Sequence, residues 1–129
     1  MQKLVMLFSV LVGYQSFAVT PYDPLPTTVL SCGGGLITSI GGRLEDDRLF
    51  ETGASVVLNN RGAGVAYQKD PSIPAISKSR VGDHMLVCLV FVPKDCPAGD
   101  LRGRVYTMTN LRTLESWTLP DSEHVCGGV

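Results

Sequence analysis

Positive charge is scarce in this sequence compared with what nucleic-acid binding requires. The 129 residues include 11 Lys and Arg against 12 Asp and Glu, which gives a formal net charge of −1. Nonspecific binding to nucleic acid draws much of its free energy from counterions that are released when basic side chains neutralise phosphates. Because the chain has no basic surplus, we expect no nucleic-acid partner.

Catalytic motifs are also missing. The sequence contains no Gly-x-Ser-x-Gly, the strained turn that presents a nucleophilic serine in many hydrolases. The acidic cluster of residues 45–51 occupies a single charged connection, whereas glycoside hydrolysis needs two carboxyl groups facing each other across a groove. The sequence therefore gives enzyme activity little support, and we expect no cofactor.

Histidine is represented only by His84 and His124, each of which follows an acidic residue. A metal site or a small hydrolase that used both would require the C-terminal residues to fold back towards His84. This arrangement is the alternative enzyme hypothesis. Two unrelated surface histidines are the simpler interpretation.

No apolar run reaches the length of about 20 residues that a membrane-spanning helix requires. The apolar residues 4–13 follow Lys3 and precede Ser16-Phe17-Ala18, a pattern that predicts a secretory signal peptide over residues 1–18. A retained N-terminal anchor is the alternative. We expect an exported protein, periplasmic or secreted, with no membrane span after cleavage. Loss of Lys3 would leave ten basic residues against twelve acidic ones, a net charge of about −2.

Three prolines in residues 19–28 predict an extended N-terminal arm, followed by a single β domain over residues 29–129. The arm separates Cys32 from the apolar leader, which argues against lipid attachment at that cysteine.

Cysteine occurs four times, and an even number in an exported chain favours two disulfides. No two of the cysteines have the short spacing of a structural zinc site. Three pairings are open to four cysteines. We favour Cys88–Cys96, which closes a short loop, with Cys32–Cys126, because joining distant residues constrains the unfolded chain most.

Helical periodicity is weak after residue 18, and short β-branched runs alternate with Gly, Pro and Asn clusters. Residues 59–62, Asn-Asn-Arg-Gly, give the clearest hairpin signal, whereas the proline-containing residues 69–79 predict a loop. The pattern predicts an all-β fold of six or seven antiparallel strands, in a small barrel or sandwich stapled by two disulfides.

The central apolar run begins at His84 and is apolar on both of its alternating faces. Its second face is then covered either by loops of the chain or by a subunit contact. In the second case the protein would be a structural component of the cell envelope that self-associates.

A second hairpin is predicted from residues 101–109 and 114–119. A four-residue loop over 110–113 would set Tyr106 opposite Trp117 and align Arg102 and Arg104 on the same face. Arginine and aromatic residues are enriched where proteins recognise one another, although a buried aromatic pair is the ordinary alternative. These four residues form the candidate binding face.

Together these observations predict an exported binding or inhibitor module that recognises another protein, such as a cell-envelope hydrolase or a toxin. The alternatives are a small hydrolase or metal-binding protein that uses His84 and His124, and the self-associating envelope component. The sequence does not specify an oligomeric state.

Overall fold

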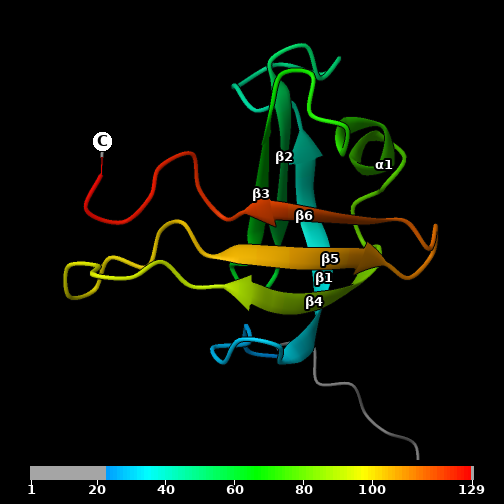
Figure 1. Cartoon of the computed structure of the whole chain (residues 1–129). Helices are drawn as coiled ribbons and strands as arrows, with labels where there is room; N and C mark the ends of the chain where they lie inside the picture. The colour runs from blue at the N-terminus through cyan, green and yellow to red at the C-terminus, as the bar shows by residue number, and fades with distance from the viewer. Residues whose placement is uncertain (1–22, 129) are drawn as a thin grey trace, which may run out of the picture.

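A computed structural model describes residues 23–128 and confirms the all-β fold (Figure 1). Six antiparallel strands form one sheet in the order β3-β2-β1-β4-β5-β6, curled into a half-barrel. The strands are β1 (Cys32–Gly41), β2 (Gly53–Leu58), β3 (Ala63–Tyr67), β4 (His84–Phe91), β5 (Val105–Asn110) and β6 (Ser116–Pro120). The predicted signal peptide and the first residues of the arm lie outside the described residues.

Strand β1 is the long element that both halves of the sheet share. Its first half pairs with β4, from Cys32 opposite Cys88 to Leu36 opposite His84. Its second half pairs with β2, and the register shifts between Ile37 and Ser39. A register shift of this kind bends a strand and increases its twist. The β1–β2–β3 half therefore crosses the β4–β5–β6 half, as Figure 1 shows.

The triple glycine in β1 makes room for the N-terminal arm. A Cβ at Gly33 would lie 3.3 Å from the carbonyl oxygen of Pro24, and one at Gly34 would lie 3.0 Å from the carboxylate of Asp23. Asn60 donates from Nδ2 to the carbonyl oxygens of Gly34 and Asp23, at 3.1 and 2.9 Å. Residues 23–26 and the Asn60 side chain thus cover the edge of β1 that β2 does not reach.

The β2–β3 hairpin is confirmed, and its turn uses the predicted residues in an unexpected way. Arg61 adopts the left-handed conformation with φ 67°, although Asn and Gly are the residues that favour it. Asn59 and Asn60 instead use their side chains to bind the backbone of β1, for example through a 3.0 Å hydrogen bond from the Leu36 N–H to Asn59 Oδ1.

The core lies inside the curl, between the two halves of the sheet. Along β4 every second side chain, at Met85, Val87 and Leu89, is buried, which is the alternation of a strand with one face on the core. The edge strands β3 and β6 approach closely, since a Cβ at Gly64 would lie 3.6 Å from Leu119.

Residues 69–79 contain a short helix, α1 (Ile73–Ser77), where the sequence predicts only a loop. Pro74 lies in its first turn, where the missing N–H has no helical acceptor to lose. Ile76 is fully buried, so this single turn of helix is held by its contact with the core. No helix within residues 23–128 has the length and apolar character needed to cross a membrane.

Two disulfides are present, but the predicted pairing is wrong. The bonds are Cys32–Cys88 and Cys96–Cys126, not Cys88–Cys96 and Cys32–Cys126. Cys32 and Cys88 are opposed across β1 and β4, so strand register brings their Cα atoms to 4.0 Å. The two bonds join cysteines that are 56 and 30 residues apart in the sequence. In the chain-entropy model, closing loops of these lengths stabilises the folded state by about 4 kcal/mol each.

Candidate functional site

The aromatic members of the candidate binding face belong to the core. Tyr106 is 1% exposed and Trp117 is 3% exposed. The hairpin register also differs by two residues from the predicted one, because Trp117 pairs with Met108 and Tyr106 with Leu119. The proposal that these two aromatic side chains form a recognition surface is therefore wrong, and the ordinary alternative of buried aromatic residues holds.

The two arginines of that face precede β5 and lie in the loop that connects it to β4. Arg102 is exposed and donates to both carboxylate oxygens of Asp100, from Nε at 2.9 Å and from Nη2 at 2.8 Å. These charge-assisted bonds hold the pKa of Asp100 well below its usual range and raise that of Arg102. Arg104 is partly buried at the base of the loop.

His84 and His124 are both exposed, at the start of β4 and in the C-terminal segment. Within residues 23–128 no group of three or more His, Cys, Asp and Glu side chains is arranged to hold a metal ion. Neither histidine therefore has the neighbours that the metal-site hypothesis requires among these residues.

Residues 92–104, the β4–β5 loop, extend away from the end of the sheet (Figure 1). A turn forms at its tip, where the N–H of Asp100 donates to the carbonyl oxygen of Pro97 at 3.0 Å. Gly99 occupies the third position of this turn with φ 82°, which favours glycine. A sequence of Pro, Ala, Gly and Asp thus forms a defined turn.

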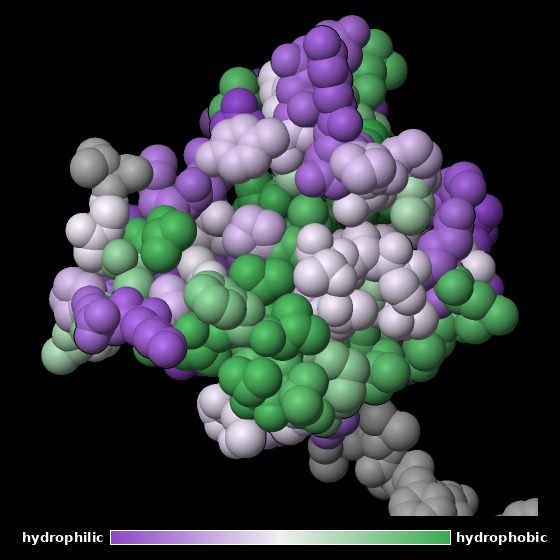
Figure 2. All heavy atoms as spheres, in the orientation of Figure 1, coloured by the Kyte–Doolittle hydropathy of each residue, from purple (hydrophilic) through white to green (hydrophobic). Residues whose placement is uncertain are grey.

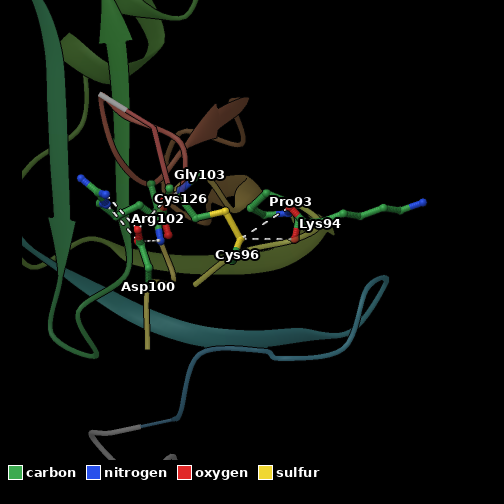
Figure 3. Close-up of a disulfide and its surroundings, with 9 residues drawn as sticks. Pro93, Lys94, Cys96, Asp100, Arg102, Gly103 and Cys126 are labelled. Atoms are coloured by element: carbon green, nitrogen blue, oxygen red, sulfur yellow. Dashed lines mark hydrogen bonds and ion pairs between the residues drawn. A yellow bond between two sulfur atoms is a disulfide. The ribbon is translucent and has the colours of Figure 1, made fainter. Parts of the chain in front are cut away.

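The C-terminal segment, residues 121–128, is bonded to this loop at several positions (Figure 3). The Cys96–Cys126 disulfide joins the two segments covalently. Beside it, the N–H of Cys126 donates to the carbonyl oxygen of Arg102 at 3.0 Å, and the N–H of Gly127 donates to Asp100 Oδ2 at 3.0 Å. The part of the loop that leaves β4 and the part that enters β5 are therefore both bonded to the C-terminal segment.

Asp121 fixes the base of the loop. Its carboxylate accepts a hydrogen bond from the N–H of Gly103 at 2.8 Å, and its own N–H donates to the carbonyl oxygen of Arg104 at 2.9 Å. Burial raises the pKa of Asp121, and the Gly103 hydrogen bond and the Arg104 charge oppose that shift. Val125 packs against Gly103, where a Cβ would lie 3.1 Å from it.

The C-terminal segment is itself held to the body of the domain through Glu123. Its carboxylate pairs with Arg43 at 2.8 Å, and its carbonyl oxygen accepts a hydrogen bond from the Tyr67 hydroxyl at 3.1 Å. Arg43 also lies over the Tyr67 ring, 5.0 Å from its centroid. These contacts connect the loop indirectly to β3 and to the β1–β2 connection.

The tip of the loop remains exposed although its base is fixed. Pro97, Ala98 and Gly99 are exposed, and the side chain of Leu101 is 58% exposed. Residues 98–102 line an open depression together with Asp121 and Ser122. The arrangement offers backbone groups and a leucine side chain at an exposed, anchored tip, and these features are suited to recognition.

A second exposed feature is the outer face of β4. Leu86 is 41% exposed and Phe91 is 51% exposed, and within residues 23–128 no loop covers them. Figure 2 shows apolar residues gathered over β4, with more neutral residues over β5 and β6. Thr107 and Thr118 contribute there, with hydroxyl groups 2.7 Å apart.

The residues that sequence reasoning missed are Leu101 and Asp121, whereas residues 95–100 already predict an exposed turn suited to a binding loop. The ion pair of Asp100 could have been found from the spacing Asp-x-Arg, because Arg102 donates to the carboxylate two residues before it. The role of Asp121 depends on the C-terminal segment lying beside the loop, and no local pattern predicts that.

Comparisons with protein-family models, with curated proteins and with solved structures found no match to this chain.

Proposed function

We propose that the protein is an exported module that binds another protein through the β4–β5 loop. The observation that carries the proposal is the combination of a fixed base and an exposed tip. Cys96–Cys126 and the Asp100 hydrogen bonds hold the loop, whereas Ala98 and Leu101 are open to solvent. The predicted signal peptide and the two disulfides support the exported setting.

Fixing the loop before binding favours affinity. Association costs free energy for each flexible segment that becomes ordered, about 0.5–1.5 kcal/mol for each immobilised side chain. The β4–β5 loop is already ordered before binding. It is held by the disulfide, by the Asp100–Arg102 ion pair and by backbone hydrogen bonds to residues 121–127.

The charges of the exposed part of the loop are balanced, which restricts the kind of partner. Lys94 and Arg102 offset Asp95 and Asp100, and Arg102 is already paired. Arg104, the remaining charged residue of the loop, is partly buried at the base, where its charge acts on Asp121. The tip therefore presents Pro97, Ala98 and Leu101 to a partner, and the charges that flank these residues cancel. It would suit an apolar cleft in a partner protein, and an extracytoplasmic hydrolase or toxin with such a cleft is the class that we propose.

Capture experiments with matched variants test this proposal. The protein without its predicted signal peptide is immobilised as wild type, Leu101→Asp or Leu49→Asp. The amount of each partner protein that it captures from envelope and secreted fractions is then quantified. Leu49 is 77% exposed in the β1–β2 connection and serves as the control. We expect Leu101→Asp to reduce recovery of a specific partner by about tenfold or more, as for an interface residue that contributes strongly. Equal recovery by all three proteins would contradict the proposal.

A double variant separates loop order from loop composition. Cys96→Ser with Cys126→Ser retains every exposed side chain of the tip but removes the covalent anchor. We expect weaker capture than wild type, with faster dissociation. Unchanged capture by a folded double variant would show that the anchoring does not serve binding.

A further inference from the structure

We propose that Cys32–Cys88 is a site of thiol–disulfide exchange that a dithiol cleaves while Cys96–Cys126 remains intact. The inference concerns the outer face of β4 and does not depend on the proposed binding function of the β4–β5 loop.

The first argument is access to the sulfur atoms. Cys32 and Cys88 are a register pair of β1 and β4, and their side chains point outwards, since Val87 and Leu89 on either side of Cys88 are buried. Cys32 is exposed and Cys88 is partly exposed. A thiolate must approach one sulfur along the line of the S–S bond, and exposure of Cys32 permits that approach.

The second argument is the chemistry of the surrounding face. The neighbours of Cys88 on this face are Leu86 and Val90 in β4 and Thr107, its register partner in β5. None of these side chains carries a charge. On the β1 side, the carboxylate of Asp23 accepts a hydrogen bond from the N–H of Gly34, two residues from Cys32, at 3.3 Å. An incoming thiolate therefore meets no carboxylate from the β4 and β5 positions, and a partner with an apolar surface around its reactive thiol would fit the exposed Leu86.

The other disulfide is less accessible. Cys96 and Cys126 are each only partly exposed, as Cys88 is, so this bond has no exposed cysteine to match Cys32. The Cys96 Sγ also lies 3.6 Å from the carbonyl oxygen of Pro93 (Figure 3). A disulfide sulfur has no proton to donate, so this is a contact that places a partial negative charge beside the sulfur. Asp95 precedes Cys96, and the Asp100 carboxylate binds the N–H of Gly127 next to Cys126. Lys94 and Arg102 offset these two carboxylates, so the lower access and the Pro93 carbonyl oxygen, not net charge, disfavour attack at this bond.

The exchange is a two-electron transfer with balanced atoms. A thiolate of the dithiol attacks the Cys32 Sγ, the Cys32–Cys88 bond breaks, and Cys88 leaves as a thiolate that takes up a proton. The second thiol of the dithiol then loses its proton and attacks the mixed disulfide. This step releases Cys32 as a thiol and oxidises the dithiol to its own disulfide.

The sheet does not depend on this bond alone for its alignment. Four further register pairs, from Gly33 to Leu36, join β1 to β4. Beyond Cys32 the pairing continues through the N–H of Leu30, which donates to the Leu89 carbonyl oxygen at 2.8 Å. Reduction would therefore free two thiols on the outer face of a folded domain.

Graded reduction followed by alkylation tests the inference. The oxidised protein is equilibrated with increasing dithiothreitol, free thiols are trapped with iodoacetamide, and each cysteine is quantified by peptide mass spectrometry while circular dichroism follows the sheet. We expect Cys32 and Cys88 to be alkylated at reductant concentrations at least about tenfold below those that expose Cys96 and Cys126, with the sheet signal retained. Simultaneous reduction, the reverse order, or alkylation only on loss of the sheet signal would overturn the inference.

A charge variant tests the role of the face separately. Leu86→Asp places a carboxylate beside the bond, and Leu49→Asp places one on the β1–β2 connection. We expect Leu86→Asp to slow the reduction of Cys32–Cys88 several-fold at low ionic strength, whereas Leu49→Asp leaves the rate unchanged. Equal rates in both variants would overturn the assigned approach across this face.

Discussion

Arg112 donates two hydrogen bonds of 2.8 Å to the carboxylate of Asp83, one from Nε and one from Nη2. Asp83 is only 8% exposed and also accepts from Asn110 Nδ2 at 2.8 Å and from the N–H of Arg80 at 2.9 Å. Asn110 in turn accepts from the N–H of Arg112 through Oδ1 at 2.8 Å. This cluster joins the β5–β6 turn to the segment that enters β4, and it explains why a charged side chain is buried there.

Replacing Asp83 with Asn should destabilise the fold strongly. The variant removes charge-assisted hydrogen bonds from a buried position, although Arg112, which is 40% exposed, keeps its charge in contact with water. The loss of hydrogen bonds to a charged group costs about 1.5–3 kcal/mol. Asp46→Asn is the control, because Asp46 is exposed with φ 64°, a conformation that Asn tolerates well. Urea denaturation should show a large shift for the first variant and almost none for the second. Equal midpoints would contradict the importance of the cluster.

Stability should fall steeply in acid. Hydrogen bonds from Thr52 lower the pKa of Asp47 from 3.8 to about 2, and hydrogen bonds from Arg112 and Arg102 lower those of Asp83 and Asp100 further. A carboxyl whose folded pKa is depressed stabilises the protein above its unfolded pKa and loses that contribution as pH falls through the folded pKa. Asp121, with a raised pKa, acts in the opposite direction.

We therefore expect the free energy of unfolding to decrease between about pH 4 and pH 2, and Asp83→Asn to flatten that dependence. Urea denaturation at a series of pH values measures it. A wild-type stability that is constant over this range would refute the electrostatic account.

Gly53 and Gly82 form a matched pair for testing how closely β2 and β3 pack. Both have positive φ, 120° and 91°, so alanine introduces backbone strain at either position. A Cβ at Gly53 would also clash with the carbonyl oxygen of Ala66, whereas one at Gly82 meets nothing within 4 Å. We expect Gly82→Ala to cost about 1 kcal/mol and Gly53→Ala about 2 kcal/mol more, measured by thermal or urea unfolding. Equal costs would show that the strand approach is looser than described.

Trp117 is the sole tryptophan, so its fluorescence reports directly on the corrected assignment of the binding face. Its side chain is 3% exposed in the described structure. We expect native emission to be blue-shifted and poorly quenched by acrylamide, and both properties to be lost in urea. Efficient quenching of the native protein would return Trp117 to the surface and restore the original recognition hypothesis.

Local sequence patterns predicted much of the fold. The apolar run that begins at His84 and the Asn-Asn-Arg-Gly turn at residues 59–62 depend on neighbours in sequence, and both elements formed where expected. The second hairpin was displaced because Asn110 binds the backbone of Arg112 and Thr113, and Leu114 adopts φ 60°, which makes a longer turn than the predicted one.

The disulfides and the loop anchoring depend on contacts between distant residues, which local patterns do not encode. Loop-closure entropy favours joining Cys32 to Cys126, but strand register decides the pairing because Cys88 lies opposite Cys32 in the sheet. The same limitation applies to the β4–β5 loop. Its rigidity comes from residues 121–127, which are adjacent to it only after folding.

Site-specific photo-cross-linking tests the central claim most directly. A photoreactive amino acid is placed at Ala98 in the tip of the β4–β5 loop, or at the control position Leu49, and the full chain is expressed and irradiated in the cells that export it. The account predicts a discrete cross-linked partner from position 98 that is absent from position 49 and is lost when Leu101→Asp is added. No cross-link from position 98, or the same products from both positions, would contradict the claim that this loop binds a protein.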